Sequence, residues 1–453
     1  MNTSDTICAV CTGLGGAISI LRVAGPEALK ATQSVWRGTA LLGKSNARKM
    51  LLGNILENGR CCENALAVYM PGPHSYTGDD VVELHTHGGA VSAKRAIRSL
   101  LASGFCRPAE PGEFTYRAFV NGKLDLTQAE AVGDLISAQT ESALHLAERQ
   151  LAGHLREKVT ELRNTLTEIA AECESHLDFP DEVLDWTPDE KMLLQLGGVL
   201  DTVSELVDGA KNGMVLREGI RVVIAGRPNA GKSSLLNRIL QTDRAIVTDI
   251  AGTTRDTLEE QAVIRGIPVR ITDTAGIRKS DDTIETLGID RSLQSIRNAQ
   301  VVFWLLDASA PDLELELTEL HQQQIDSDRI IVIWNKCDLP IVSARKLPAI
   351  AGALMLSAKT GTGLDVLFDR FSEIVWNGKT SEEPDIAINE RHLASLREVK
   401  AFLPEAIHEI AAQRYELAAI SLYGAISSLG EITGETVQPD VLDKIFSKFC
   451  IGK

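Results

Sequence analysis

The sequence contains no apolar run of membrane-spanning length, and its first residues show no basic segment followed by an apolar one. A helix that crosses a bilayer needs about 20 consecutive apolar residues. A secretory signal needs a charged segment before an apolar one. We therefore expect a cytoplasmic protein with no membrane association. The chain has 453 residues, of which 44% are hydrophobic, enough for about three domains with cores of their own.

Positive charge and metal-ligand patterns are also scarce. The net charge of −16 argues against broad binding of nucleic acid by charge alone, although a local basic patch is still compatible with it. Cys8 and Cys11 have CxxC spacing, but no second pair completes a zinc site. They lie three residues apart in an expected strand and so point to opposite faces. We interpret them as small apolar residues.

The pattern of apolar residues changes along the chain and divides it into four segments. Residues 1–120 alternate short strand-like runs with glycine turns, as expected for an α+β unit. Residues 121–218 have a helical pattern, and residues 378–453 resume it after a polar linker. Residues 219–377 alternate strands and helices between them. The simplest architecture is therefore an α/β domain inserted into a helical domain, with an α+β domain in front.

The most specific motif is GxxxxGKS at residues 226–233, which follows an apolar strand and precedes a helix. This combination is a P-loop. Gly226 and Gly231 let the backbone curl so that its N–H groups point at phosphate oxygens. Lys232 supplies a cation for the β- and γ-phosphates, and Ser233 supplies a hydroxyl for Mg²⁺. The residues predicted to bind the phosphates are Asn229, Ala230, Gly231, Lys232, Ser233 and Ser234.

Three further motifs follow in the order found in GTPases. Asn335-Lys336-Cys337-Asp338 comes after an apolar strand, and its aspartate can accept two hydrogen bonds that guanine offers and adenine lacks. Ser357-Ala358-Lys359 matches the element that supports the base. Asp273-Thr274-Ala275-Gly276 ends a strand, and the aspartate can hold the Mg²⁺ shell. Thr254 is placed to close on Mg²⁺ when the γ-phosphate is present.

One departure from Ras-like GTPases concerns the attacking water. Ile277 stands where those proteins carry a glutamine, and it cannot orient a water by hydrogen bonding. Hydrolysis therefore needs other help. The Asn229 side chain could coordinate a monovalent cation that neutralises developing charge, as an arginine finger does. Alternatively, Asn229 only stabilises the turn of the loop.

The chain resembles the MnmE (TrmE) family of tRNA-modification GTPases over nearly its whole length. The resemblance rests on motifs that P-loop GTPases in general lack as well as on those that they share. These motifs are GRPNAGKSSLLN at 226–237, GTTRD at 252–256, DTAGIR at 273–278, SYTGDDVVELHTHGG at 75–89, RPAEPGEFTYRAFVNGKLDLTQAEAV at 107–132, LDFPDE at 177–182 and CIGK at 450–453.

The resemblance implies a function. Members of the family form homodimers and work in a heterotetramer with the FAD protein MnmG on tRNA. Together they add a carboxymethylaminomethyl or aminomethyl group to C5 of the wobble uridine. The carbon comes from a tetrahydrofolate, either the 5-formyl or the 5,10-methylene derivative. The N-terminal domain dimerises and binds this folate, and potassium stimulates GTP hydrolysis.

The resemblance also implies roles for individual residues. It makes Glu285 the residue that orients the water and Cys450 a participant in the modification chemistry. The Mg²⁺ ligands would be Ser233 and Thr254, and the folate ligands would be Arg22, Glu83, Lys123 and Lys453. The K⁺ ligands would be Asn229, Thr248, Ile250 and Thr253, of which Thr248 and Thr253 also border the nucleotide.

A second hypothesis is a regulatory GTPase that switches ribosome assembly or another RNA process without modification chemistry. The nucleotide motifs alone fit both hypotheses. The N-terminal motifs and the CIGK sequence favour the enzyme. A basic RNA-binding domain near the C-terminus would have favoured the switch, and the sequence has none.

Overall fold

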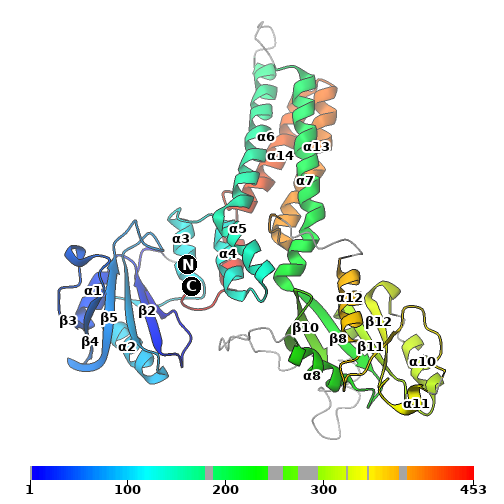
Figure 1. Cartoon of the computed structure of the whole chain (residues 1–453). Coiled ribbons are helices and arrows are strands. Elements are labelled where there is room, and N and C mark those ends of the chain that lie inside the picture. The colour runs from blue at the N-terminus through cyan, green and yellow to red at the C-terminus, as the bar shows by residue number, and fades with distance from the viewer. Residues whose placement is uncertain are drawn as a thin grey trace.

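The computed structural model of the chain has three parts: Figure 1 shows an N-terminal lobe and an α/β lobe on either side of a helical stalk. It describes residues 3–178, 187–242, 259–273, 294–322, 325–343, 346–376 and 385–453.

The N-terminal lobe is an α+β domain built on a seven-stranded sheet. Its elements are β1 (Ile7–Val10), β2 (Ile18–Ala24), α1 (Ala28–Val35), β3 (Trp36–Gly38), η1 (Lys44–Asn46), β4 (Leu51–Glu57), β5 (Arg60–Met70), β6 (Val81–His87), α2 (Ala90–Ala102), β7 (Arg107–Pro108) and α3 (Glu113–Val120). The strand order is β3-β4-β5-β6-β2-β1-β7, and only the β1–β7 pair is parallel. Helices α1 and α2 bury their apolar residues against the sheet.

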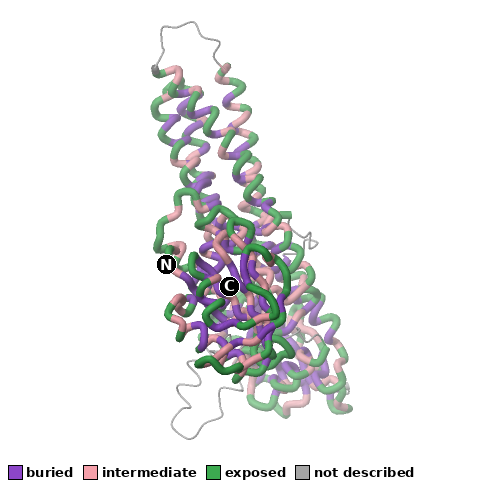
Figure 2. Tube along the Cα trace, turned by 90° about the vertical axis from the view of Figure 1, so that its left-hand side faces the viewer, coloured by how far each residue is buried: buried purple, intermediate pink, exposed green. Residues whose placement is uncertain are grey.

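The central part is helical. Its elements are α4 (Leu126–Ser137), α5 (Glu141–Ala152), α6 (His154–Asp178), α7 (Asp189–Glu218), α13 (Glu390–Ala411), α14 (Tyr415–Thr433) and α15 (Pro439–Phe446). The long helices α6, α7, α13 and α14 share one core of buried apolar side chains, and Figure 2 marks buried residues in purple along the helices. Gly153, with a φ of 101°, ends α5. None of the helices in the described ranges has the length and apolarity that a bilayer crossing requires.

The α/β domain lies between α7 and α13 in the chain, so it is inserted into the helical domain. Its elements are β8 (Ile220–Gly226), α8 (Lys232–Thr242), β9 (Glu259–Ile264), β10 (Ile267–Asp273), β11 (Val301–Asp307), α10 (Leu313–Gln322), η3 (Ser327–Arg329), β12 (Ile330–Asn335), α11 (Pro340–Ser343), β13 (Leu354–Met355) and α12 (Leu364–Val375). The strand order is β13-β12-β11-β8-β10-β9, and only β9 is antiparallel to its neighbour. Its core extends into the helical domain through Leu146, Val215 and Leu216.

A buried ionic cluster joins the two sequence-distant parts of the helical domain. Glu130 of α4 accepts hydrogen bonds from Asn389 at 3.1 Å and from Arg391 at 2.9 and 3.0 Å. Its Oε2 lies 2.8 Å from Nε2 of His392, which is fully buried. Burial acts to raise the pKa of Glu130, but His392 and Arg391 outweigh it and lower this pKa. Because Arg391 is always charged, Glu130 is ionised at neutral pH.

The neutral form of His392 fits the same cluster. Burial lowers its pKa, although Glu130 opposes this shift. Its Nδ1 accepts a hydrogen bond from the Asn389 backbone N–H at 3.4 Å, and its Nε2 lies 2.8 Å from Glu130 Oε2 and 2.9 Å from Arg391 Nη2. Arg217, at the end of α7 and beside the entry to the α/β domain, pairs with Asp134 of α4 at 2.7 Å. Helix α4 is therefore bound at both connections of the inserted domain.

The residues after α15 return to the N-terminal domain. Phe446 and Phe449 pack on α3 and α4 together with Tyr116 and Phe119. The Phe114 N–H donates to the Lys453 carbonyl at 3.0 Å. Gly452 has a φ of 99° and lies so close to the Val10 carbonyl that a Cβ would meet it at 2.6 Å. The close approach and the positive φ both require glycine at this position.

Replacing Glu130 by alanine is expected to lower the free energy of unfolding by about 3–5 kcal/mol, because the Arg391 charge would be left buried without its partner. Urea unfolding followed by helical circular dichroism measures this loss. The matched control is Lys158→Ala, which breaks the exposed Lys158–Glu161 pair and should cost below about 1 kcal/mol. Equal losses in both variants would contradict the role of the cluster.

Candidate functional site

The register of the parallel strands gathers the nucleotide motifs at one edge of the inserted sheet. Gly226 at the end of β8 pairs with Leu305, and Asp307 at the end of β11 pairs with Asn335 at the end of β12. The carboxyl ends of parallel strands form the usual ligand edge of such sheets, above all where strand order reverses. Here β8 lies between β10 and β11, so the P-loop begins at that point.

The P-loop has the curled backbone that the sequence predicts. Gly226, Asn229 and Gly231 all have positive φ, at 133°, 64° and 100°. A Cβ on Gly226 would lie 2.2 Å from the Leu305 carbonyl oxygen, so only glycine fits there. Lys232 Nζ donates to the carbonyls of Gly226 and Arg227, each at 2.8 Å, which holds the ammonium group over the loop. The loop thus fits a phosphate chain, and its helix α8 adds an N-terminal partial charge.

Asn335 joins the P-loop to the segment that supports the base. Its Nδ2 donates to the Ala230 carbonyl at 2.7 Å, and its Oδ1 accepts from the Ala358 N–H at 2.9 Å. The side chain is buried, with 2% of its surface exposed. A buried amide with both ends satisfied fixes two loops relative to each other.

The other residues of the Asn-Lys-x-Asp motif are also held in place. Lys336 Nζ donates to Asp307 Oδ2 at 2.6 Å. Burial acts to raise the pKa of Asp307, but hydrogen bonds from Lys336 and Ser309 outweigh it and lower this pKa. Asp338 is exposed, and its Oδ1 accepts from the Ser357 hydroxyl at 2.7 Å. The Asp338 carboxylate is therefore oriented by Ser357 and still accessible to a base.

Three supporting residues were missed in the sequence. Asp307 holds Lys336; its position at the end of a strand on the ligand edge could have revealed it. Arg238 of α8 donates to the carbonyls of Ala358 and Lys359. Glu316 of α10 accepts from the Asp307 N–H at 3.1 Å and contacts Arg227 of the P-loop at 3.4 Å. The sequence carries no local signal for Arg238 or Glu316, because their partners are distant along the chain.

Several predicted site residues lie outside the described part of the chain. Only the backbone of Asp273, at the end of β10, is described. Ser233 and Ser234 lie exposed at the start of α8, and Lys359 is exposed after β13. The predicted residues outside the described ranges are Thr248, Ile250, Thr253, Thr254, Thr274, Ala275, Gly276 and Glu285.

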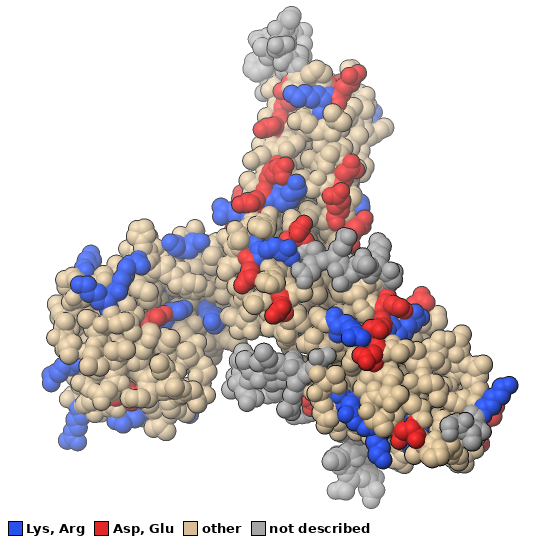
Figure 3. All heavy atoms as spheres, in the orientation of Figure 1, with Lys and Arg blue, Asp and Glu red and all other residues tan. Residues whose placement is uncertain are grey.

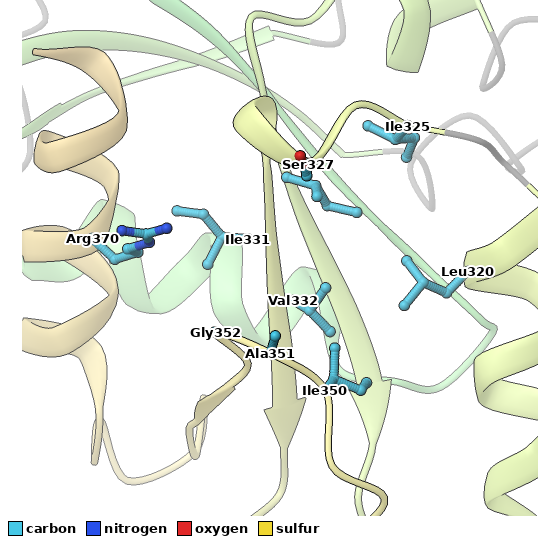
Figure 4. Close-up of a pocket in the computed structure, with 10 residues that line it drawn as sticks. Leu320, Ile325, Ser327, Ile331, Val332, Ile350, Ala351, Gly352 and Arg370 are labelled. Carbon is cyan, nitrogen blue, oxygen red and sulfur yellow. The ribbon is translucent and has the colours of Figure 1, made fainter. Parts of the chain in front are cut away.

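A cavity of about 250 Å³ in the inserted domain lies away from these motifs. Figure 4 shows Ile331 and Val332 of β12 lining it together with Leu320 and Ile350. These strand residues belong to the first half of β12, whereas Asn335 ends the strand. The cavity therefore opens at the edge opposite to the nucleotide motifs.

The residues predicted to bind folate meet at one place in the N-terminal domain. Arg22 of β2 and Glu83 of β6 are paired across the sheet, with Nε and Nη2 at 3.0 and 2.9 Å from Oε1. Burial raises the pKa of the Cys11 thiol, and Arg22, Glu83 and Lys453 are charged groups close enough to act on it. Gly452 packs on Val10 and Cys11, so Lys453 follows a residue that lies against β1, the strand paired with the Arg22 strand β2. The Arg22 guanidinium also lies 5.3 Å from the Tyr76 ring centroid, a cation–π distance.

Lys123 and Cys450 lie near the segments that surround the Arg22–Glu83 pair. Lys123 Nζ donates to the Pro73 carbonyl at 3.2 Å, in the loop that carries Tyr76. Cys450 is exposed, and its carbonyl accepts from Gly112 at 3.4 Å and from Lys453 at 3.3 Å. Cys450, three residues before the last residue of the chain, therefore lies against the N-terminal domain. In the part of the chain that the structure describes, no group of three potential metal ligands occurs.

The inserted domain has the sheet, the P-loop and the Asn-Lys-x-Asp site of a P-loop GTPase. Comparison with known proteins adds the family. Residues 6–123 match the family described as "GTP-binding protein TrmE N-terminus", and residues 126–450 match the "MnmE helical domain". The chain belongs to the MnmE family of tRNA modification GTPases.

Curated relatives cover the whole chain. Proteins named "tRNA modification GTPase MnmE" from Natranaerobius thermophilus and Clostridioides difficile are 41% and 39% identical, with 100% of both chains covered. The protein of that name from Thermotoga maritima is 42% identical over 99% of this chain and 100% of its own. A solved structure of an Aquifex aeolicus Era variant with GDP and AlF4⁻ is 28% identical to this chain. The match covers 40% of this chain and 66% of the Era chain, with a TM-score of 0.26.

Replacing Asn335 by alanine is expected to weaken GTP and GDP binding about 10- to 100-fold, because the Ala230 carbonyl and the Ala358 N–H lose a buried partner. Titration with a fluorescent guanine nucleotide measures the affinity. Asn237→Ala, at an exposed position of α8, is the control and should bind like the unmodified protein. An unchanged affinity in the Asn335 variant would show that the bridge does not support the site.

Proposed function

We propose that this protein is a potassium-stimulated GTPase that acts on tRNA together with the FAD protein MnmG. The pair adds a carboxymethylaminomethyl or aminomethyl group to C5 of the wobble uridine at position 34. A tetrahydrofolate, in its 5-formyl or 5,10-methylene form, donates the carbon. The protein works as a homodimer within a heterotetramer and acts in the cytoplasm. Family membership and the contacts described above support this proposal.

The proposed division of labour follows the chain. Residues 1–120 form the folate-binding and dimerisation domain. Residues 219–377 bind and hydrolyse GTP. Residues 121–218 and 378–453 form the helical domain between them. The ionic cluster around Glu130 supports this scheme, since it binds the helices next to both connections of the GTPase domain.

In the nucleotide site, the chain's own residues bind and orient the phosphates and the base. The P-loop N–H groups and Lys232 bind the phosphates. Asp338 accepts hydrogen bonds from guanine, with Ser357 holding its carboxylate. Ser233 and Thr254 would hold Mg²⁺ with Asp273 supporting its ligand shell, and Asn229, Thr248, Ile250 and Thr253 would hold K⁺; both ions would supply positive charge at the phosphates. Thr274, Ala275 and Gly276 border the γ-phosphate, and Glu285 orients the attacking water.

In the N-terminal domain, the charged groups suit a folate. A pterin offers hydrogen-bond donors to the Glu83 carboxylate, which Arg22 orients. A folate tail carries carboxylates that suit Lys123 and Lys453. Cys450, exposed beside them, is the proposed participant in the modification chemistry.

The contact of residues 450–453 with the N-terminal domain is the observation that carries this proposal. Gly452 packs on Val10 and Cys11, and the Lys453 carbonyl binds Phe114. A GTPase that only regulates an RNA assembly process would not need Cys450 and Lys453 to lie against the domain that carries the charged Arg22–Glu83 pair. Family membership favours the same choice.

Hydrolysis of GTP is expected to be faster in potassium than in sodium chloride. The decisive variant is Asn229→Gly, because glycine keeps the positive φ of 64° and removes only the side-chain oxygen. Its rate should be the same in both salts if Asn229 binds the ion. Phosphate release at equal ionic strength measures these rates. A variant that keeps the potassium preference would assign Asn229 to the turn alone.

Deleting the gene in its source organism should leave the wobble uridine without the C5 group in the tRNAs that normally carry it. Mass spectrometry of nucleosides from purified tRNA measures this change. The gene supplied in trans should restore the modified nucleoside, and the Asn335→Ala variant should restore it less. Normal modification in the deletion strain would refute the proposed enzyme.

A further inference from the structure

The charge of the protein is distributed unevenly between its domains. Residues 1–123 contain thirteen Lys or Arg and nine Asp or Glu, an excess of four positive charges. The whole chain has a net charge of −16, so the remainder carries an excess of twenty negative charges. Figure 3 shows Lys and Arg atoms over the N-terminal domain with few Asp or Glu atoms on that face, whereas both kinds alternate along the helices. The N-terminal domain is thus a basic part of an acidic protein.

Four cations of this domain gather at one end of its sheet, where β3 and β5 end and β4 and β6 begin. We call Lys44, Arg48, Lys49 and Lys123 the cationic edge. The Arg48 N–H donates to the Tyr69 carbonyl at 2.8 Å, and its guanidinium donates to the His74 carbonyl. Lys123 binds the neighbouring Pro73 carbonyl. The loop at 71–80 therefore holds two of these cations against the end of the sheet.

Among the described residues, no carboxylate pairs with the cationic edge, because the carboxylates near it have other partners. Across the described residues, none of its four members has a carboxylate oxygen within 4.0 Å. Asp80 accepts hydrogen bonds from the Tyr69 hydroxyl at 2.9 Å and the Gly72 N–H at 3.0 Å. Asp79 accepts from Asn121 at 3.2 Å. All four cations are exposed, so a ligand of opposite charge can reach them.

The edge leads directly to the proposed folate site. Two residues after His74, the Tyr76 ring lies against the Arg22 guanidinium, and the Tyr76 hydroxyl is 2.9 Å from Thr115 Oγ1. Tyr76 is 36% exposed, and His74 is exposed. Exposed aromatic side chains next to Lys and Arg are typical of surfaces that bind unpaired nucleotides, because bases stack on them while cations contact phosphates.

We propose that the cationic edge binds the phosphate backbone of the tRNA substrate and directs an unpaired base toward Tyr76 and the Arg22–Glu83 pair. This inference rests on the proposed function. Lys44 and Lys49 lie in the segment between β3 and β4. Their ammonium groups act as point charges, so they would contact phosphates without selecting the base sequence. The acidic remainder of the chain repels RNA elsewhere and so confines it to this edge.

The test uses the full chain and a fluorescently labelled, unmodified transcript of a tRNA with uridine at the wobble position. The variant is Lys44→Glu together with Lys49→Glu, which leaves Lys123 and the folate residues unchanged. It should bind the transcript at least about tenfold more weakly and with a smaller dependence of log Kd on log salt. Fluorescence anisotropy at several salt concentrations measures both.

The matched control is Arg60→Glu together with Lys94→Glu. Both residues are exposed cations of the same domain, at the β4–β5 turn and on α2, toward the other end of the sheet. The net charge changes equally, so RNA binding close to that of the unmodified protein supports a local site. An equal loss in both variants, or no loss in either, would overturn the inference. GTP hydrolysis at the normal rate in both variants shows that they are folded.

Two further results separate this inference from other possibilities. Leu41 and Met50 are exposed beside the edge, so vesicles containing phosphatidylserine serve as a second probe. Loss of vesicle binding with unchanged RNA binding in the Lys44/Lys49 variant would overturn the RNA assignment. If the deletion strain keeps its wobble modification, the proposed function fails whatever the anisotropy shows. If that strain loses it and the Lys44/Lys49 variant binds tRNA normally, the inference alone fails.

Discussion

The architecture depends on the buried ionic contact between Glu130 and the residues that begin α13. The partners are 259 positions apart in the chain, with the whole GTPase domain between them. Without a contact of this kind, the helices before and after the insertion would be held together by apolar packing alone, which fixes position less uniquely than a satisfied polar network. Arg217 and Asp134 repeat the arrangement at the other connection. Both ends of the inserted domain are thus fastened to one short helix, α4.

That arrangement bears on how the two candidate sites can influence each other. The nucleotide motifs lie on the carboxyl edge of the inserted sheet, and Arg22 and Glu83, which are predicted to bind folate, lie in the N-terminal domain. Helix α4 contacts Phe446 beside the C-terminal residues and also binds the two connections of the GTPase domain. A displacement of α4 would therefore reach both sites.

The sequence predicted most of the fold and the core of the nucleotide site, because each GTPase motif is a contiguous segment between a strand and a helix. The assignment of Arg22, Glu83 and Lys453 to folate stays a prediction from the resemblance, since nothing local in the sequence connects residues so far apart. The sequence could not predict Asp307 as the partner of Lys336, because that pairing depends on the register of β11 and β12. The ionic cluster was missed for a similar reason. Glu130 reads as an ordinary helix residue until folding brings Arg391 to it.

The contact of residues 450–453 with the N-terminal domain has a consequence for synthesis of the chain. Residues 3–123 leave the ribosome first and contain their own sheet and core, so they can fold early. The face formed by Val10, Cys11 and Phe114 then lacks its contact with residues 450–453, which are synthesised more than three hundred positions later. At typical elongation rates this interval is on the order of 15–65 s. The contacts of residues 450–453 with Val10, Cys11 and Phe114 can therefore form only after every other domain has been translated.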